Sequence, residues 1–140
     1  MSKHENNGQC SHCQEILNKY EGFNQHLRDW FEEVQAAQPE THLSCAGRGR
    51  IEQESDFHRG ASRAHYGQSS HNFNCAIDLF CLVPGLDLYD RAWFASVIAP
   101  RITSQLEWYG KPDAPFKELP HVEIKLWKEL VQEGLAKLVE

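Results

Sequence analysis

The sequence has no long apolar stretch. None of its apolar runs approaches the roughly 20 residues that a helix needs to span a bilayer. The opening segment, MSKHENNGQCSHC, also lacks the apolar centre of a signal peptide. We therefore expect a protein that is made in the cytoplasm, carries no export signal and does not insert into a membrane.

Basic residues are outnumbered by acidic ones. The chain has 14 Lys and Arg against 20 Asp and Glu, which gives a formal net charge of −6. A nucleic-acid binder needs a basic face, so this balance argues against that class of partner. The five cysteines are an odd number and cannot all pair within one chain, which favours a reducing compartment.

The 140 residues fit one domain, and we expect it to span residues 1–140 with a flexible stretch at 1–9. Apolar residues recur at helical spacing at 16–34, 89–102 and 127–138, and a short polar helix is expected near 52–58. Short strands are expected at 42–46, 106–109 and 122–125, and the apolar run at 75–83 is typical of a buried strand. This mixture predicts an α+β fold in which helices flank a small antiparallel sheet.

An aspartate interrupts the predicted buried strand. Asp78 lies inside the apolar run at 75–83, where a charge is costly unless it is paired or bound to a metal. Together with Asp78, His71 and His121 supply the three ligands that a catalytic zinc ion usually takes from a protein. Such an ion lowers the pKa of its water to about 7, and Glu118, close before His121 in the chain, is a candidate to accept the proton.

Two segments carry the strongest pattern. The first, SSHNFNCAID at 69–78, resembles the Ser-x-His-x-x-Gly-x-Ala-x-Asp motif of the zinc D,D- and L,D-peptidases of the VanY and endolysin type, the M15 family. The second, ELPHVE at 118–123, is similar to that family's Asp/Glu-x-Pro-His-x-Glu motif. LEW at 106–108, and SCAGR at 44–48 followed by Gln53, resemble further segments of the family. The resemblance covers residues 42–125, which would form the catalytic core.

This resemblance implies how the residues divide the chemistry. His71, Asp78 and His121 would hold the zinc ion, and Glu118 would act as the general base. Arg48 would stabilise the oxyanion that forms when water attacks the scissile carbonyl. A guanidinium suits that role because it keeps its charge and offers a fork of donors. The implied fold is that of the hedgehog and D-Ala-D-Ala peptidase group.

Several positions keep a second interpretation. Arg50 competes with Arg48, although the spacing to the glutamine of the family segment favours Arg48. Ser69 either orients a ligand or the substrate, or caps the turn. Glu123 either supports a ligand histidine or faces solvent. Asn74 stands where the family has glycine, and asparagine also tolerates a left-handed backbone, so we expect the turn to survive.

The segment Cys10-Ser11-His12-Cys13 has the cysteine spacing of a second zinc site or a redox pair. A structural zinc ion takes four ligands, and the sequence has no second CxxC. His4, His12 or His26 could complete a set, but no spacing rule selects among them. The sequence therefore favours a helix start that carries two thiols.

The resemblance implies a peptidoglycan hydrolase. We expect it to cut the stem peptide between L-Ala and D-Glu, because the segments at 106–108 and 120–123 look more like the endolysin branch of the family. The expected role is a phage or prophage endolysin that acts as a monomer, builds up in the host cytoplasm and reaches the wall after the membrane is permeabilised. Two alternatives stay open: a D,D-carboxypeptidase of the VanY type, and a non-catalytic zinc-containing binding module of the same fold.

Overall fold

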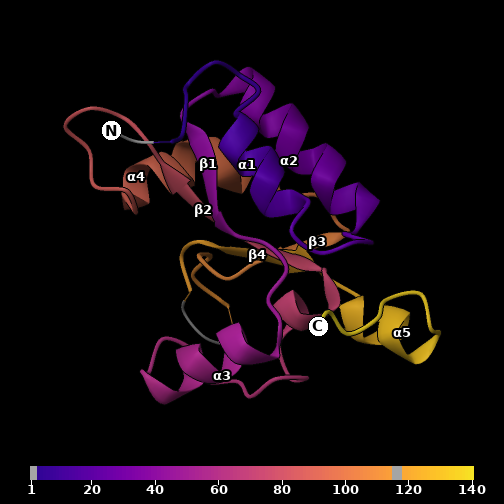
Figure 1. Ribbon diagram of the computed structural model, residues 1–140. Helices are drawn as coiled ribbons and strands as arrows, with labels where there is room; N and C mark the ends of the chain where they lie inside the picture. Colours follow the sequence, from indigo (N-terminus) through magenta and orange to yellow (C-terminus); the bar gives the residue numbers. More distant parts are fainter. Residues whose placement is uncertain (1–2, 115–117) are drawn as a thin grey trace.

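A four-stranded antiparallel sheet organises the chain, which the computed structural model describes over residues 3–114 and 118–140 (Figure 1). The strand order is β1-β2-β4-β3. The strands are β1 Thr41–Cys45, β2 Ala76–Cys81, β3 Leu106–Trp108 and β4 His121–Ile124. Each overlaps a stretch where the sequence predicts a strand, and helices lie around the sheet. The predicted α+β fold with a small antiparallel sheet is confirmed.

The predicted continuous helix at 16–34 is wrong. The chain instead forms α1 Ser11–Leu17 and α2 Gln25–Ala37, which are joined by a turn. Gly22 in that turn has a φ of +84°, a backbone conformation that glycine adopts readily and that a helix does not contain. Asn24 then caps α2 by accepting a hydrogen bond from the backbone N–H of Leu27.

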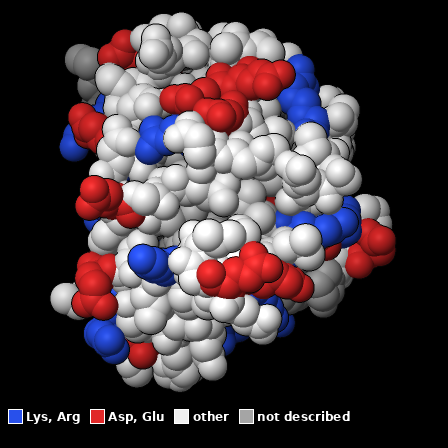
Figure 2. Space-filling view, turned by 90° about the vertical axis from the view of Figure 1, so that its right-hand side faces the viewer, with Lys and Arg blue, Asp and Glu red and all other residues white. Residues whose placement is uncertain are grey.

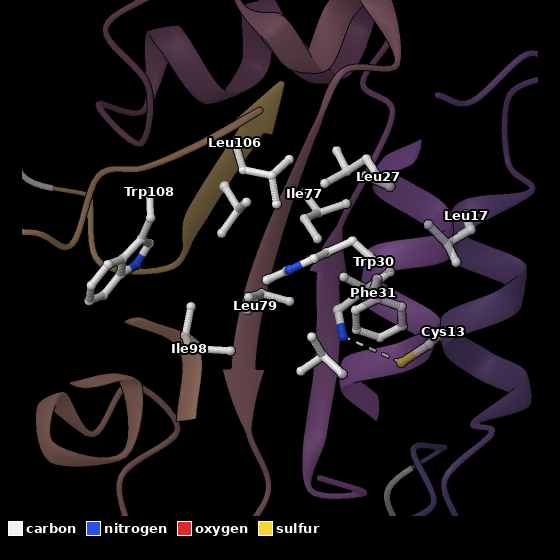
Figure 3. Close-up of a cluster of buried hydrophobic side chains, with 14 of the residues drawn as sticks. Cys13, Leu17, Leu27, Trp30, Phe31, Ile77, Leu79, Ile98, Leu106 and Trp108 are labelled. Carbon is white, nitrogen blue, oxygen red and sulfur yellow. Dashed lines mark hydrogen bonds between the residues drawn. The ribbon is translucent and has the colours of Figure 1, made fainter. Parts of the chain in front are cut away.

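The main core lies between the sheet and the pair α1 and α2, which run alongside β1 (Figures 1 and 3). Phe31 of α2, Leu79 of β2 and Ile98 are fully buried there. Removing such side chains from water is the dominant favourable contribution to folding. The central strand β2, which carries Asp78, is therefore anchored by apolar packing.

The remaining helices are short or irregular. They are α3 Arg50–His58, η1 Ser70–Phe73, α4 Arg91–Trp93, η2 Phe94–Ile98, η3 Ala99–Arg101 and α5 Trp127–Gln132. The predicted helix at 89–102 is helical from 91 to 101 but changes from α to π to 3-10 geometry, and Pro100 contributes no N–H to its last turn. The final helix ends earlier than predicted, and Gly134, shortly after its end, has a φ of +75°.

Charged side chains are distributed over the surface. Figure 2 shows a face on which acidic and basic side chains form separate small groups, with neither sign covering it continuously. Within residues 3–114 and 118–140, no helix has both the length and the apolar character needed to cross a membrane.

Candidate metal centre

His71, Asp78 and His121 come together at one end of the sheet. Asp78 lies in β2, and strand pairing places it opposite His121, the first residue of β4. His71 lies in η1, the short helix that leads into β2. The two histidine rings lie with their centroids 5.0 Å apart. Asp78 thus lies inside the buried strand that the apolar run at 75–83 predicts, and the fold brings both histidines beside it.

The donor atoms of these side chains are spaced like ligands of one small ion. Asp78 Oδ1 lies 3.2 Å from His71 Nε2 and 3.3 Å from His121 Nδ1. In a tetrahedron, zinc bonds of about 2.0–2.1 Å would separate neighbouring nitrogen and oxygen ligands by about 3.3 Å. Both distances agree with that separation, so Asp78 is placed to share an ion such as zinc with each of the two rings.

The second nitrogen of each ring has a partner that fixes its proton. His71 Nδ1 donates to the carbonyl oxygen of Ala46 at 2.7 Å, and His121 Nε2 donates to Glu123 Oε1 at 2.7 Å. Because a carbonyl oxygen can only accept, Nδ1 of His71 carries a hydrogen and Nε2 can be left free. Metal-binding histidines are usually oriented by this kind of bond. Each ring thus turns the nitrogen suited to a metal toward Asp78.

Glu123 is buried behind His121. Its Oε1 accepts hydrogen bonds from His121 and from Ser70 Oγ at 2.7 Å, and its Oε2 accepts from Tyr109 at 2.8 Å and Trp127 at 3.1 Å. Burial raises the pKa of Glu123, but these bonds, led by the one from His121, outweigh it and lower the pKa. The solvent-facing alternative for Glu123 is wrong. Ser70 and Tyr109 are supporting residues that no sequence pattern indicated.

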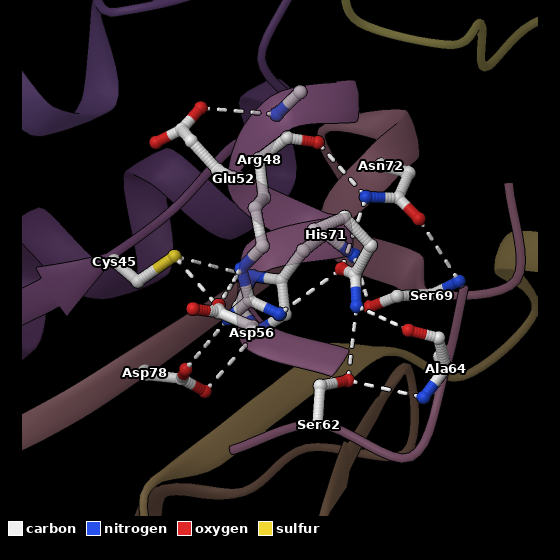
Figure 4. Close-up of polar contacts among 12 residues, drawn as sticks. Cys45, Arg48, Glu52, Asp56, Ser62, Ala64, Ser69, His71, Asn72 and Asp78 are labelled. Carbon is white, nitrogen blue, oxygen red and sulfur yellow. Dashed lines mark hydrogen bonds and ion pairs between the residues drawn. The ribbon is translucent and has the colours of Figure 1, made fainter. Parts of the chain in front are cut away.

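Arg48 lies beside Asp78 and is held there by α3 (Figure 4). Its Nη2 lies 3.4 Å from Asp78 Oδ2, and its Nε lies 3.2 Å from Asp56 Oδ2. Its Nη1 also donates to Gln53 Oε1 at 3.1 Å. These partners fix a guanidinium next to the candidate ligands, with only 11% of the side chain exposed.

Sequence reasoning missed Asp56 as a partner of Arg48. Gln53 and Asp56 are three positions apart in α3, so they share one face of that helix, and helical spacing could have found the second from the first. The competing Arg50 lies over the ring of Tyr66, 4.5 Å from its centroid. Arg48, not Arg50, is therefore the arginine at the centre.

A cleft of about 550 Å³ opens beside the donor set, and its walls include Arg48, His71, Glu118 and His121. Glu118 Oε2 lies 4.0 Å from His121 Nδ1, the nitrogen that faces Asp78. The Glu118 side chain is 46% exposed, so it reaches both the donor set and solvent. A carboxylate in this position can accept a proton from a water molecule in the cleft.

The same fold occurs in an L-Ala D-Glu endopeptidase. The crystal structure of ChiX, the L-Ala D-Glu endopeptidase of Serratia marcescens, matches this chain with a TM-score of 0.66 and 17% sequence identity. The match covers 84% of this chain and 89% of that one. At this identity the likeness establishes a peptidase-like fold, and function must be argued from the site. No family model and no curated protein matches the sequence.

Cys45 offers another donor at the same end of the sheet. Its sulfur, a donor atom of His71 and one of Asp78 lie within 4.8 Å of one another. The sulfur is 3.8 Å from His71 Nδ1, but that nitrogen is already bonded to the Ala46 carbonyl. Cys45 and His121 are thus two candidates for the third donor, and His121 turns its Nδ1 toward Asp78 while its other nitrogen is engaged by Glu123.

The turn before β2 directs His71. Ser69 caps η1, and its Oγ accepts a hydrogen bond from the backbone N–H of His71 at 3.2 Å, in agreement with its capping alternative. Asn74 ends the turn with φ +57° and ψ +33°, the left-handed conformation that asparagine tolerates and that the sequence predicts here. Its Nδ2 donates to the carbonyl oxygen of Glu21 at 3.0 Å. The local sequence thus fixes both ends of the segment that carries His71.

The side chains around the donor set favour the charged forms of Asp78 and His71. Burial raises the pKa of Asp78, but His71 and the hydrogen bond from His121 outweigh burial and hold that pKa well below its usual range. Burial also opposes the charged form of His71, while Asp78 and Cys45 raise its pKa well above the ordinary value. A bound dication would replace these protons and stabilise the carboxylate in the same way. Shifts of this kind in a cleft are typical of functional sites.

Proposed function

We propose that this protein is a zinc-dependent peptidase that cuts the stem peptides of bacterial peptidoglycan between L-Ala and D-Glu. The observation that carries the proposal is the donor set, in which Asp78 Oδ1 lies 3.2 Å and 3.3 Å from one nitrogen each of His71 and His121. Two imidazoles and one carboxylate, with the second nitrogen of each ring engaged, suit a catalytic zinc ion. The fold shared with an L-Ala D-Glu endopeptidase supports the choice of bond.

Glu118 and Arg48 have separate roles in this proposed reaction. When bound, the zinc ion would polarise the scissile carbonyl and lower the pKa of water to about 7. Glu118 accepts a proton from the attacking water at its carboxylate and passes it to the leaving amine. Arg48 directs its guanidinium at the negative charge that develops on the carbonyl oxygen. Gln53 and Asp56 hold that guanidinium in place.

We further infer a role in bacterial cell lysis by a phage or prophage. The protein would act as a monomer on the wall once the inner membrane has been opened. Cutting at the base of the stem peptide releases glycan strands from their cross-links, as lysis requires. A net charge of −6 provides no long-range attraction to an anionic wall, so recognition would depend on contacts within the cleft.

Digestion of purified peptidoglycan by zinc-loaded protein tests the proposal, with mass spectrometry of the products. New N-terminal D-Glu on the stem peptides is the expected result. Released D-Ala without new D-Glu termini would instead assign a D,D-carboxypeptidase. An unchanged digest from protein that holds zinc would assign a non-catalytic binding module.

Two substitutions separate metal binding from proton transfer. His71→Ala should lose zinc and activity together. Glu118→Ala should keep zinc and lose turnover by about 10²–10⁴-fold, the usual contribution of a general base. Glu133→Ala removes an exposed carboxylate that does not line the cleft and should keep both properties. Full activity of Glu118→Ala would show that the base is wrongly assigned, and Glu123 could not replace it because both of its oxygens are engaged.

A further inference from the structure

A second set of metal-type ligands lies near the start of β1, away from the cleft. It consists of His4, Cys10, Cys13 and His42, whose donor atoms all lie within 4.8 Å of one another. Cys10 and Cys13 flank the first turn of α1, and His42 belongs to β1. Cys13 is labelled at the α1 side of the core in Figure 3. None of the four takes part in the peptidase reaction proposed above.

The distances in this cluster suit a tetrahedral ion. His4 Nδ1 lies 3.6 Å from Cys10 Sγ and 3.4 Å from Cys13 Sγ, and His42 Nδ1 lies 3.4 Å from Cys13 Sγ. Zinc–sulfur bonds of about 2.3 Å and zinc–nitrogen bonds of about 2.0–2.1 Å would place these donors about 3.5 Å apart. Each of the three distances agrees with that value.

His42 is oriented as a metal ligand would be. Its Nε2 lies 2.6 Å from Asn6 Oδ1, and Asn6 is itself fixed because its Nδ2 donates to the carbonyl oxygen of Leu82 at 2.8 Å. The amide oxygen of Asn6 can only accept, so Nε2 of His42 carries the hydrogen. Nδ1 is then the nitrogen that can be left free, and it is the one that faces Cys13.

The surroundings of the thiols favour a closed metal site over redox chemistry. Cys10 and Cys13 both have 0% exposure, whereas thiol exchange requires access for a second thiol. The backbone N–H of Leu43 donates to Cys13 Sγ at 3.3 Å, and Gln35 Nε2 donates to it at 3.5 Å. Burial raises the pKa of the Cys13 thiol to about 12, and these two donors act against burial by favouring the thiolate, the form that binds a metal.

We propose that His4, Cys10, Cys13 and His42 form a structural zinc site. Two cysteines and two histidines fill a tetrahedral shell and leave no position for a substrate, as is usual where zinc stabilises a fold. The ion would join the segment before α1, the start of α1 and the edge strand β1. Residues 3–9, expected from the sequence to be flexible, would thereby be fastened to the sheet. This proposal does not depend on the peptidase function.

Cobalt substitution distinguishes the two metal centres. Wild-type protein loaded with Co²⁺ should show sulfur-to-cobalt charge-transfer absorption. His71→Ala and Cys45→Ser should keep that absorption, since they alter only the centre at the cleft. The double variant Cys10→Ser/Cys13→Ser should lose it and should hold less zinc by one ion per chain. Cys81→Ser, which alters a fully buried thiol outside both clusters, should behave as wild type.

Several outcomes would overturn the proposal. They are wild-type protein without the absorption, a double variant with unchanged zinc content, and a Cys10–Cys13 disulfide found by mass spectrometry. If the double variant does not fold, X-ray absorption at the zinc edge of the Cys45→Ser protein tests the proposal instead. In that protein the cluster of His4, Cys10, Cys13 and His42 supplies sulfur ligands at about 2.3 Å, whereas the centre at the cleft no longer has a cysteine. Sulfur-bound zinc in a protein without peptidase activity would refute the proposed function and leave the structural site standing.

Discussion

Replacing Glu123 by glutamine tests whether the support of His121 matters for the metal. The carboxylate accepts hydrogen bonds from His121, Ser70, Tyr109 and Trp127. An amide oxygen can keep the two bonds of Oε1, but the amide nitrogen then faces the N–H of Trp127, which cannot accept. A hydrogen bond to a charged group contributes about 1.5–3 kcal/mol to stability. Metal-free Glu123→Gln protein should therefore be about 2–4 kcal/mol less stable than metal-free wild type. Its zinc affinity should fall about 10–100-fold.

Two measurements check this expectation for Glu123→Gln. Urea unfolding of metal-free protein gives the stability, and recovery of activity during zinc titration against a chelator gives the affinity. Folding lowers the pKa of Glu123, so the stability advantage of the wild type should be complete above the ordinary glutamate pKa and be lost as the pH falls through the folded-state value. Glu54→Gln, at a surface pair with His65, should change stability by less than about 0.5 kcal/mol. An unchanged zinc affinity in Glu123→Gln would refute the orienting role.

Two other substitutions test the arginine and the turn. Arg48→Lys keeps the charge, but the lysine cannot bond to Gln53 and Asp56 with the same fork of donors. The kcat on peptidoglycan should therefore fall about 10²–10³-fold with zinc content unchanged. A parallel loss of zinc would contradict this role of Arg48. Asn74→Ala should be less stable than Asn74→Gly by about 1–2 kcal/mol in urea unfolding, because only alanine is strained at a φ of +57°. Both variants lose the bond to Glu21, so equal stability of the two would show that the turn stores no such strain.

Local patterns predict which side chains come together at this end of the sheet. Asp78 was recognisable as a charge inside an apolar run, and His71 lies in the same short segment, so their proximity follows from one turn and one strand. His121 belongs to a separate segment, but β2 and β4 pair with Asp78 opposite it. Strand pairing therefore brings two short motifs together, and the sequence showed each motif although it could not show the pairing.

Contacts between elements were the part that the sequence could not supply. Helical spacing continues from α1 through the turn into α2, so periodicity concealed the break at Gly22. The hydrogen bonds of Glu123 come from Ser70, Tyr109 and Trp127, which lie in three different parts of the chain. A partner chosen by packing has no fixed spacing, so only the folded chain identifies it.

The cluster of His4, Cys10, Cys13 and His42 is a second case in which sequence spacing does not identify the partners. The CxxC segment was visible, but His42 follows Cys13 by 29 residues and approaches it only because β1 packs beside α1. His26, another candidate from the sequence, is exposed. The chain thus carries two ligand sets of different chemistry. The one with two sulfurs offers four donors, three of them on buried residues, which suits a structural ion. The one with a carboxylate borders a cleft, which suits chemistry on a substrate.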